Sequence, residues 1–189
     1  MMALVRRLFL AFVFLSPTAC TTDTVVLSPT SFYAAYTPTV LNYAATHGGI
    51  LTEVTGNPFD APQEDLEQAV TQSMTGSHFG PRVAFVTTPP EAFSSPYRAV
   101  LVFDAAQNHT DLKLCRFDHG IAPQSGDKVR VHAALCANES PLTAVSGEVG
   151  EASDPGDPRF RQLIRQITVN LLPPFNPDRS SGRGTFVTF

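Results

Sequence analysis

Apolar residues recur at helical spacing in three stretches of the chain and at strand spacing in six others. The expected helices cover residues 38–47, 61–75 and 158–172. The expected strands cover residues 50–55, 83–87, 97–103, 112–117, 128–136 and 142–149. This order predicts an α+β fold with two layers, in which a mostly antiparallel sheet of about five or six strands has its helices packed on one face.

Local signals support the ends of these elements. Asp157 followed by Pro158 is typical of a helix start, and Pro173 ends the same helix. We likewise expect Asp60 to cap the helix before it. Residues 97–103 form the most apolar segment of the folded part, which predicts a central position in the sheet.

The first apolar run of the chain has the features of an export signal. Arg6 and Arg7 precede eight apolar residues, Leu8 to Leu15, and small residues follow up to Ala19. As a helix this run would span roughly 12 Å, which is too short for a hydrocarbon layer of about 30 Å. We therefore expect residues 1–19 to be a signal peptide that directs export.

Cys20 directly after Ala19 resembles the lipobox of bacterial lipoproteins, in which the cysteine carries the lipid anchor. Pro17 stands where an aliphatic residue is usual in that pattern. The resemblance implies lipidation at Cys20, and Thr21 after it implies the outer membrane, with the protein facing the periplasm. The alternative is simple removal of the signal, which would give a soluble periplasmic or secreted protein.

Four segments follow from these signals: a signal peptide (1–19), a lipid-anchored tether (20–37), one α+β domain (38–172) and a flexible C-terminal tail (173–189). Hydrophobic residues make up 43% of the chain and charged residues 16%, which suits a folded core. Loss of Arg6 and Arg7 takes the formal charge from −4 to about −6. Such a balance excludes an electrostatic footprint for nucleic acid, so we expect the membrane and an envelope protein as partners.

Two further cysteines lie symmetrically about a turn-forming stretch. A hairpin that pairs Cys115 with Cys136 would be centred between Ser125 and Gly126, where the turn residues fall. Cysteines facing each other across antiparallel strands are within disulfide range. In an oxidising compartment we expect this bond to close and to stabilise the fold by roughly 3 kcal/mol.

His119 and His132 are symmetric about the same point, so Cys115, His119, His132 and Cys136 together are a zinc-ligand set by residue type. Residues four apart along a strand are about 13 Å apart, which argues against one shared metal. The disulfide is the favoured interpretation, and free thiols or a metal site are the alternatives.

Sequence motifs of catalysis are absent. The chain has no Gly-x-Ser-x-Gly elbow, no His-Glu-x-x-His, no phosphate loop and no dinucleotide glycine fingerprint. We therefore expect no catalytic residues and no cofactor.

Three stretches, residues 51–59, 97–103 and 157–161, resemble uncharacterised lipoproteins of Gram-negative bacteria. The resemblance implies a cell-envelope lipoprotein and no activity. Our leading hypothesis is a non-enzymatic accessory module that binds a protein partner. The alternatives are a small periplasmic hydrolase or metal-dependent enzyme, and a carrier of an apolar ligand.

Overall fold

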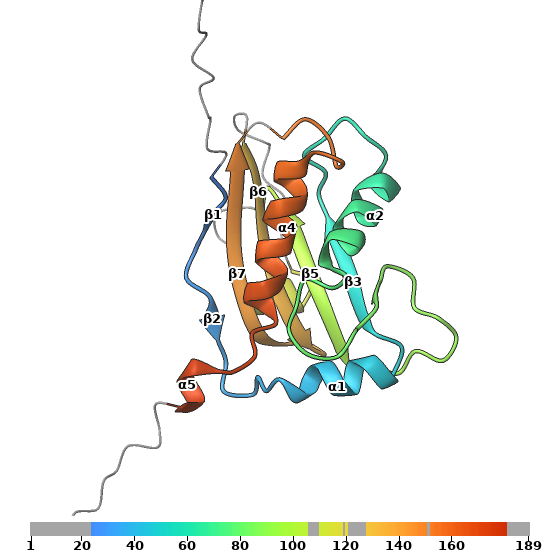
Figure 1. Ribbon diagram of the computed structural model, residues 1–189, viewed down its shortest axis with the longest axis vertical. Helices are drawn as coiled ribbons and strands as arrows, with labels where there is room; N and C mark the ends of the chain where they lie inside the picture. Colours follow the sequence, from blue (N-terminus) through green and yellow to red (C-terminus); the bar gives the residue numbers. More distant parts are fainter. Residues whose placement is uncertain (1–23, 106–109, 119, 121–127, 151, 181–189) are drawn as a thin grey trace, which may run out of the picture.

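A seven-stranded mixed sheet carries the fold in the computed structural model, which describes residues 24–105, 110–118, 120, 128–150 and 152–180. The strand order is β1-β7-β6-β5-β3-β4, and β2 also pairs with β7 (Figure 1). The strands are β1 (Val26–Leu27), β2 (Ser31–Phe32), β3 (Ile50–Thr55), β4 (Phe85–Val86), β5 (Tyr97–Phe103), β6 (Lys128–Ala137) and β7 (Ser140–Gly150). The helices are α1 (Thr39–Thr46), α2 (Gln63–Met74), α3 (Asp111–Cys115), α4 (Pro158–Leu171) and α5 (Pro177–Ser180).

Most strand pairs are antiparallel, and the sheet is open. The exceptions are the parallel pairs of β3 with β4 and with β5. The α+β class and the mostly antiparallel sheet are confirmed. The central position of β5 is confirmed too, since β5 lies between β6 and β3 and its residues from Ala99 to Phe103 are buried.

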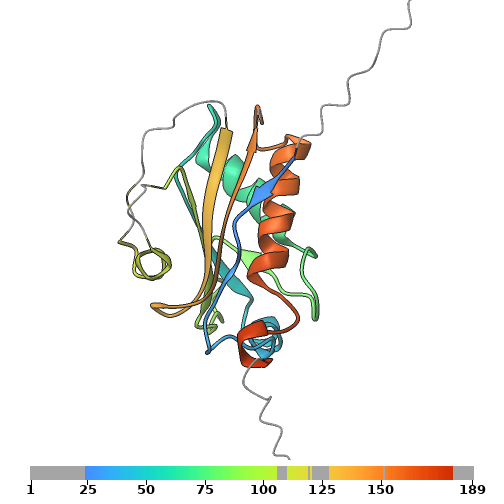
Figure 2. The ribbon, with the colours of Figure 1, turned by 90° about the vertical axis from the view of Figure 1, so that its left-hand side faces the viewer.

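One face of the sheet packs against α2 and α4 and forms the larger core (Figure 2). Alternate residues of β5 (Ala99, Leu101 and Phe103) point into it, as the period of two requires. Helix α4 contributes a stripe at helical spacing that is 0 to 1% exposed: Phe160, Leu163, Ile164, Ile167 and Leu171. This stripe is the core face that the sequence pattern predicts.

The opposite face of the sheet is covered by α3, so the expectation that all helices share one face is wrong (Figure 2). The intervening residues of β5, Val100 and Val102, form a smaller second core with Leu114. A strand with apolar side chains on both of its faces needs a packed layer on each side of the sheet to keep those side chains out of water. The near-continuous apolar run of β5 was the signal for that second layer.

The strand expected at residues 112–117 is wrong, because residues 111–115 form helix α3. Thr110 caps this helix by accepting a hydrogen bond from the Lys113 backbone N–H at 3.3 Å. Leu114 and Cys115 are buried while Leu112 is 41% exposed. Over so few residues, one helical turn and a short strand give similar patterns of burial.

The expected tether at residues 20–37 is wrong from Val26 onward. Strands β1 and β2 pair antiparallel with the outer edge of β7. The Tyr36 side chain is fully buried, and its hydroxyl donates to the Pro173 carbonyl at 2.6 Å. Threonine, serine and proline in this segment mark a broken edge strand, because Pro29 cannot donate to a ladder.

The flexible tail expected at residues 173–189 is wrong for its first half. Asn176 is 6% exposed, and its amide donates to the carbonyls of Tyr33 and Tyr36 at 3.0 and 3.3 Å. Residues 181–189 lie outside the described part. Figure 1 shows β1 beginning at the upper end of the sheet and α5 lying at the lower end.

The two helix caps predicted from aspartates have different outcomes. Asp157 caps α4 and accepts from the Arg159 backbone N–H at 2.8 Å, as expected. The cap at Asp60 is wrong, because α2 begins only at Gln63 and Pro62 occupies the cap position without a side-chain hydrogen bond. Pro62 has an extended backbone (ψ 143°), which delays the helix past the aspartate.

Candidate functional site

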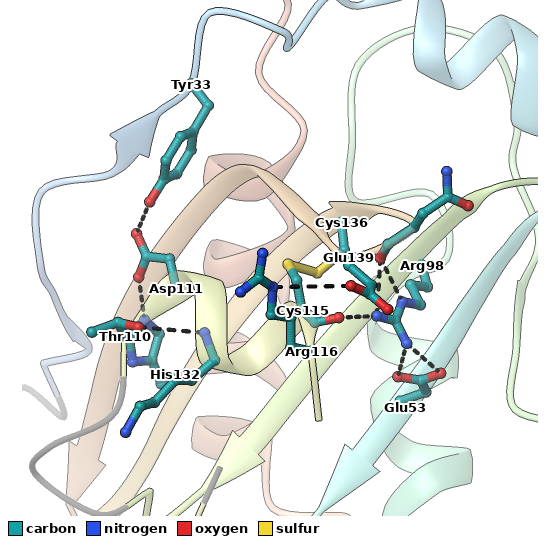
Figure 3. Close-up of a disulfide and its surroundings, with 12 residues drawn as sticks. Tyr33, Glu53, Arg98, Thr110, Asp111, Cys115, Arg116, His132, Cys136 and Glu139 are labelled. Atoms are coloured by element: carbon teal, nitrogen blue, oxygen red, sulfur yellow. Dashed lines mark hydrogen bonds and ion pairs between the residues drawn. A yellow bond between two sulfur atoms is a disulfide. The ribbon is translucent and has the colours of Figure 1, made fainter. Parts of the chain in front are cut away.

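A disulfide joins Cys115, the last residue of α3, to Cys136 of β6 (Figure 3). The two Cα atoms are 5.6 Å apart, and both side chains are fully buried. The predicted bond is therefore confirmed, but the predicted hairpin is wrong. Strand β6 pairs with β5 and β7, and Cys115 reaches Cys136 from a helix that lies over the sheet.

The alternative metal site at Cys115, His119, His132 and Cys136 is contradicted. Sulfur atoms bonded to each other are not thiolates and cannot serve as zinc ligands. His119 lies outside the described residues, and the His132 Nε2 is 3.1 Å from the Asp111 Oδ1. Within the described ranges, no group of three or more histidine, cysteine or acidic side chains could hold a metal ion.

Asp111, at the start of α3, connects the N-terminal segment to the sheet. Its Oδ2 accepts from the Tyr33 hydroxyl at 2.8 Å, and its Oδ1 contacts the His132 ring. The hydrogen bond from His132 lowers the pKa of the Asp111 carboxyl against the opposing effect of burial. Burial and the neighbouring carboxylate raise the pKa of Tyr33 to about 12. The pair is thus a phenol that stays protonated beside a carboxylate that stays ionised.

Arg98 lies at the other end of α3 and joins four parts of the chain (Figure 3). Its Nη1 is 3.3 Å from a carboxylate oxygen of Glu53 on β3. Its Nε and Nη2 donate to the Asn138 carbonyl at 3.1 and 2.9 Å, and Nη2 also donates to the Cys115 carbonyl. The Arg98 side chain is only 11% exposed, and its guanidinium satisfies the carbonyl of the buried Cys115 together with the half-buried Glu53 carboxylate.

Glu53 shows the electrostatic cost of burying part of this ion pair. Burial raises the pKa of the Glu53 carboxyl, and the positive charge of Arg98 lowers it by less. The pair is therefore an orienting contact, with little net electrostatic stabilisation.

Phe117 lies over the guanidinium of Arg98, with the Arg98 Cζ 3.9 Å from the ring centroid. Its backbone is left-handed (φ 57°), and its N–H bonds the Leu114 carbonyl at 3.3 Å. The next N–H, from Asp118, bonds the Lys113 carbonyl at 3.0 Å. These two bonds make the α3 terminus a Schellman motif with phenylalanine at the position that glycine usually occupies.

The exposed side chains of this corner form what we term the α3 surface: Leu112, Arg116, Phe117 and Glu139. Phe117 is 58% exposed and Leu112 41%. Arg116 and Glu139 flank them, with the Nε of Arg116 4.0 Å from a carboxylate oxygen of Glu139. The arrangement presents one exposed aromatic ring, supported by the Arg98 guanidinium, next in sequence to an ion pair of opposite charges.

The sequence patterns did not identify Asp111, Arg98 or Phe117 as site residues. For Arg98 a signal existed, because it is the one charged residue in the apolar run 97–103. A charge inside such a run needs buried partners. Tyr33 and Glu53 carried no comparable signal, since their partners are distant in sequence.

The predicted lipidation site, Cys20, lies outside the described residues. Within the described residues, no helix is long and apolar enough to cross a membrane. The disulfide is typical of a protein that folds in an oxidising, exported location.

Comparison with known proteins finds similar solved structures but no matching family. No family model matches the chain, and no curated protein matches it. Among solved structures, the PelC dodecamer from Paraburkholderia phytofirmans is similar at 12% identity and a TM-score of 0.40, covering 80% of this chain and 96% of PelC. A point variant of that dodecamer gives 11% identity, the same TM-score and the same coverage. Likeness at this level carries no functional inference.

Proposed function

We propose that this chain is a lipoprotein of the bacterial cell envelope, anchored to the outer membrane through Cys20, and that its folded part binds a protein partner through the α3 surface. It acts as a non-enzymatic accessory module. The observation that carries the proposal is the Phe117 side chain. It is an exposed aromatic ring on a left-handed backbone, where glycine is usual, and the Arg98 guanidinium lies against it.

The energetic argument concerns Phe117 itself. A left-handed backbone costs a residue with a Cβ roughly 1–2 kcal/mol, and glycine would avoid this cost. The contact between the buried Arg98 guanidinium and this half-exposed ring contributes roughly 0.5–2 kcal/mol, which at most offsets that cost. Stability alone therefore does not favour phenylalanine here, whereas binding does, because buried aromatic anchors dominate the energetics of protein interfaces.

The polar groups beneath the α3 surface support a binding role. Both carboxylate oxygens of Asp111 are engaged, and all three nitrogens of the Arg98 guanidinium contact Glu53, Asn138 or Cys115. Groups that are satisfied in this way position the helix and its exposed ring. A partner with an apolar socket and charges opposite to Arg116 and Glu139 would fit this surface.

A photocrosslinking experiment in intact cells tests the binding surface. A photoreactive phenylalanine analogue replaces Phe117 in one strain and Phe79 in the control strain. Phe79 is a matched control, because it is 60% exposed and lies in the loop between α2 and β4, away from α3. We expect a discrete crosslinked product from position 117 only. Equal products from both positions, or none from 117, would refute the α3 surface as the binding site.

The anchor is tested separately by the intact mass of the protein purified from membranes. We expect a mass that begins at Cys20 and includes acyl chains, and we expect Cys20→Ala to release the protein from the membrane fraction. An unmodified mature mass would exclude the lipoprotein assignment and leave the crosslinking result unaffected.

One observation favours the hydrolase alternative as a second candidate. Ser146 lies opposite His132 in the β6–β7 ladder. Because the backbone of Ser146 bonds Ser28 on its other side, the two are a non-hydrogen-bonded pair with close side chains. Asp111 of α3 contacts the His132 ring, so a serine, a histidine and a carboxylate follow one another in the order of a catalytic triad. A fluorophosphonate that labels the protein, but not Ser146→Ala, would favour this candidate, and absence of labelling would exclude it.

A further inference from the structure

The folded part begins much closer to the lipid anchor than the sequence pattern predicts. An 18-residue tether (residues 20–37) would allow the domain to move up to roughly 60 Å from the membrane. In the structure Thr24 already leads into β1, so only residues 21–23 separate it from Cys20. Four Cα steps span at most about 14 Å.

The segment after Thr24 is fixed to the sheet and does not supply extra length. The Ser28 N–H bonds the Ser146 carbonyl at 2.8 Å, and the Thr30 hydroxyl bonds Asn170 of α4 at 3.2 Å. Further along, the Tyr33 hydroxyl donates a hydrogen bond to the Asp111 carboxylate, and the Tyr36 hydroxyl donates one to the Pro173 carbonyl. Release of this segment would break contacts to β7, α3 and α4 together.

The strand register gives the direction of the anchor. Val26 of β1 pairs with Glu148 of β7, and Glu148 pairs with Arg130 of β6. Six residues further along β6, Cys136 pairs with Arg98, beneath Phe117. At about 3.3 Å per residue, these two rows are roughly 20 Å apart.

We infer that the end of the sheet where β1 begins rests on the bilayer that holds the acyl chains of Cys20, and that Phe117, at the far end of α3, lies on the side away from the membrane. The inference rests on the proposed lipidation. It explains how a short anchor leaves Phe117 open to a partner: the spacer is shorter than the distance between the two ends of the sheet.

The chemistry of the β1 end suits contact with lipid headgroups. Lys128 and Arg130 lie there. The Lys128 Nζ and the Arg130 Nε form ion pairs with the Glu148 carboxylate at 2.6 and 3.3 Å. Among the described residues, this end therefore carries side chains of both charges, with Val26 as an exposed apolar side chain (52%). Such a surface rests at the headgroup level, because insertion would remove these charges from water.

Short-range quenching by lipids in vesicles tests the orientation. The lipidated full-length protein is reconstituted in phosphatidylethanolamine–phosphatidylglycerol vesicles that contain a headgroup-labelled quencher. With Cys20 acylated and Cys115 bonded to Cys136, an introduced cysteine is the only free thiol for a fluorophore. The two positions are Val26→Cys at the β1 end and Phe175→Cys between α4 and α5 at the opposite end, which are 52% and 64% exposed in the native protein.

We expect quenching at position 26 to exceed that at position 175 several-fold. Insertion of a ten-residue Gly/Ser spacer after Thr21 should reduce the difference, because such a spacer adds a reach of roughly 17 Å. Equal quenching at both positions in protein that carries the lipid mass would overturn the orientation alone. Absence of the lipid mass would overturn the anchor and the orientation with it.

Discussion

Arg98 contributes to the fold through the shape of its side chain as much as through its charge. The planar guanidinium reaches Glu53, the Asn138 carbonyl and the Cys115 carbonyl at once, while its face supports the Phe117 ring. An ammonium group has no planar face and no fork of donors. The residue therefore joins β3, the β6–β7 turn and the end of α3 in a way that lysine cannot.

We predict that Arg98→Lys lowers the free energy of unfolding by about 2–3 kcal/mol, because at least one buried carbonyl loses its donor. Urea unfolding of the oxidised protein measures the change. Arg116→Lys is the matched control: Arg116 is 56% exposed and its ion pair is 4.0 Å long, so the expected change is below about 0.5 kcal/mol. Similar losses in both variants would contradict the special role of Arg98.

Phe117 allows a second test at this scale, in which stability and binding separate. Phe117→Gly removes the left-handed strain and the contact with Arg98 together, so we expect a net stability change within about 1 kcal/mol. The same variant should lose the partner in affinity purification from solubilised envelopes, and Phe79→Gly should retain it. A stability loss well above this range would make Phe117 a structural residue.

At the scale of elements, α4 depends on its first turn. Asp157 accepts hydrogen bonds from the backbone N–H groups of Arg159 and Ser153 and forms an ion pair with the Arg159 side chain at 2.9 Å. These contacts, with the Arg159 side-chain bond as the largest cause, lower the pKa of Asp157 from 3.8 to about 2. Because the folded state favours the ionised form, the stabilisation of the fold by the Asp157 carboxylate is complete above about pH 4 and is lost as the pH falls toward 2.

We predict that Asp157→Ala lowers the free energy of unfolding at pH 7 by about 1–2 kcal/mol. Asp157→Asn keeps a capping oxygen and should lose less at pH 7, but it should also reduce the decline of stability between pH 4 and pH 2. Urea titrations at pH 7, 4 and 2 distinguish the three proteins. An unchanged acid dependence in Asp157→Asn would show that other carboxylates determine it.

At the scale of the whole molecule, the two faces of the sheet are held by different means. The face with α2 and α4 is covered by a large apolar core, whereas the face with α3 has a small core and a disulfide. Helix α3 is too short to be stable without tertiary contacts. Its position therefore depends on the Cys115–Cys136 bond and on the contacts of Asp111 and Arg98 at its two ends.

We predict that the double variant Cys115→Ala/Cys136→Ala loses roughly 3 kcal/mol of unfolding free energy, as expected for a loop closed over 21 residues. Amide hydrogen exchange should become faster in α3 and remain slow in α4 and β7. Reductant should produce the same pattern in the native protein and no change in the variant. Equal acceleration on both faces would show that the disulfide supports the whole core.

The sequence by itself determined the elements whose signals lie within a few residues. The bounds of β3 and β5, the buried stripe of α4, its cap at Asp157 and the pairing of the two cysteines follow from period, capping chemistry and cysteine count. The cysteine pairing follows from the number of cysteines, and each of the other signals acts over one or two turns of helix or a single strand. No distant contact is needed to read them.

Only the tertiary structure decided which face α3 covers, that the N-terminal segment forms edge strands, and which residues form the α3 surface. The bond between Tyr36 and Pro173 spans 137 residues of sequence, and the bond between Arg98 and Asn138 spans 40. Contacts of this kind hold the residues expected as a tether at the edge of the sheet, and they fix the short helix α3 against the sheet. Local sequence cannot specify them, because they depend on which side chains the folded sheet brings together.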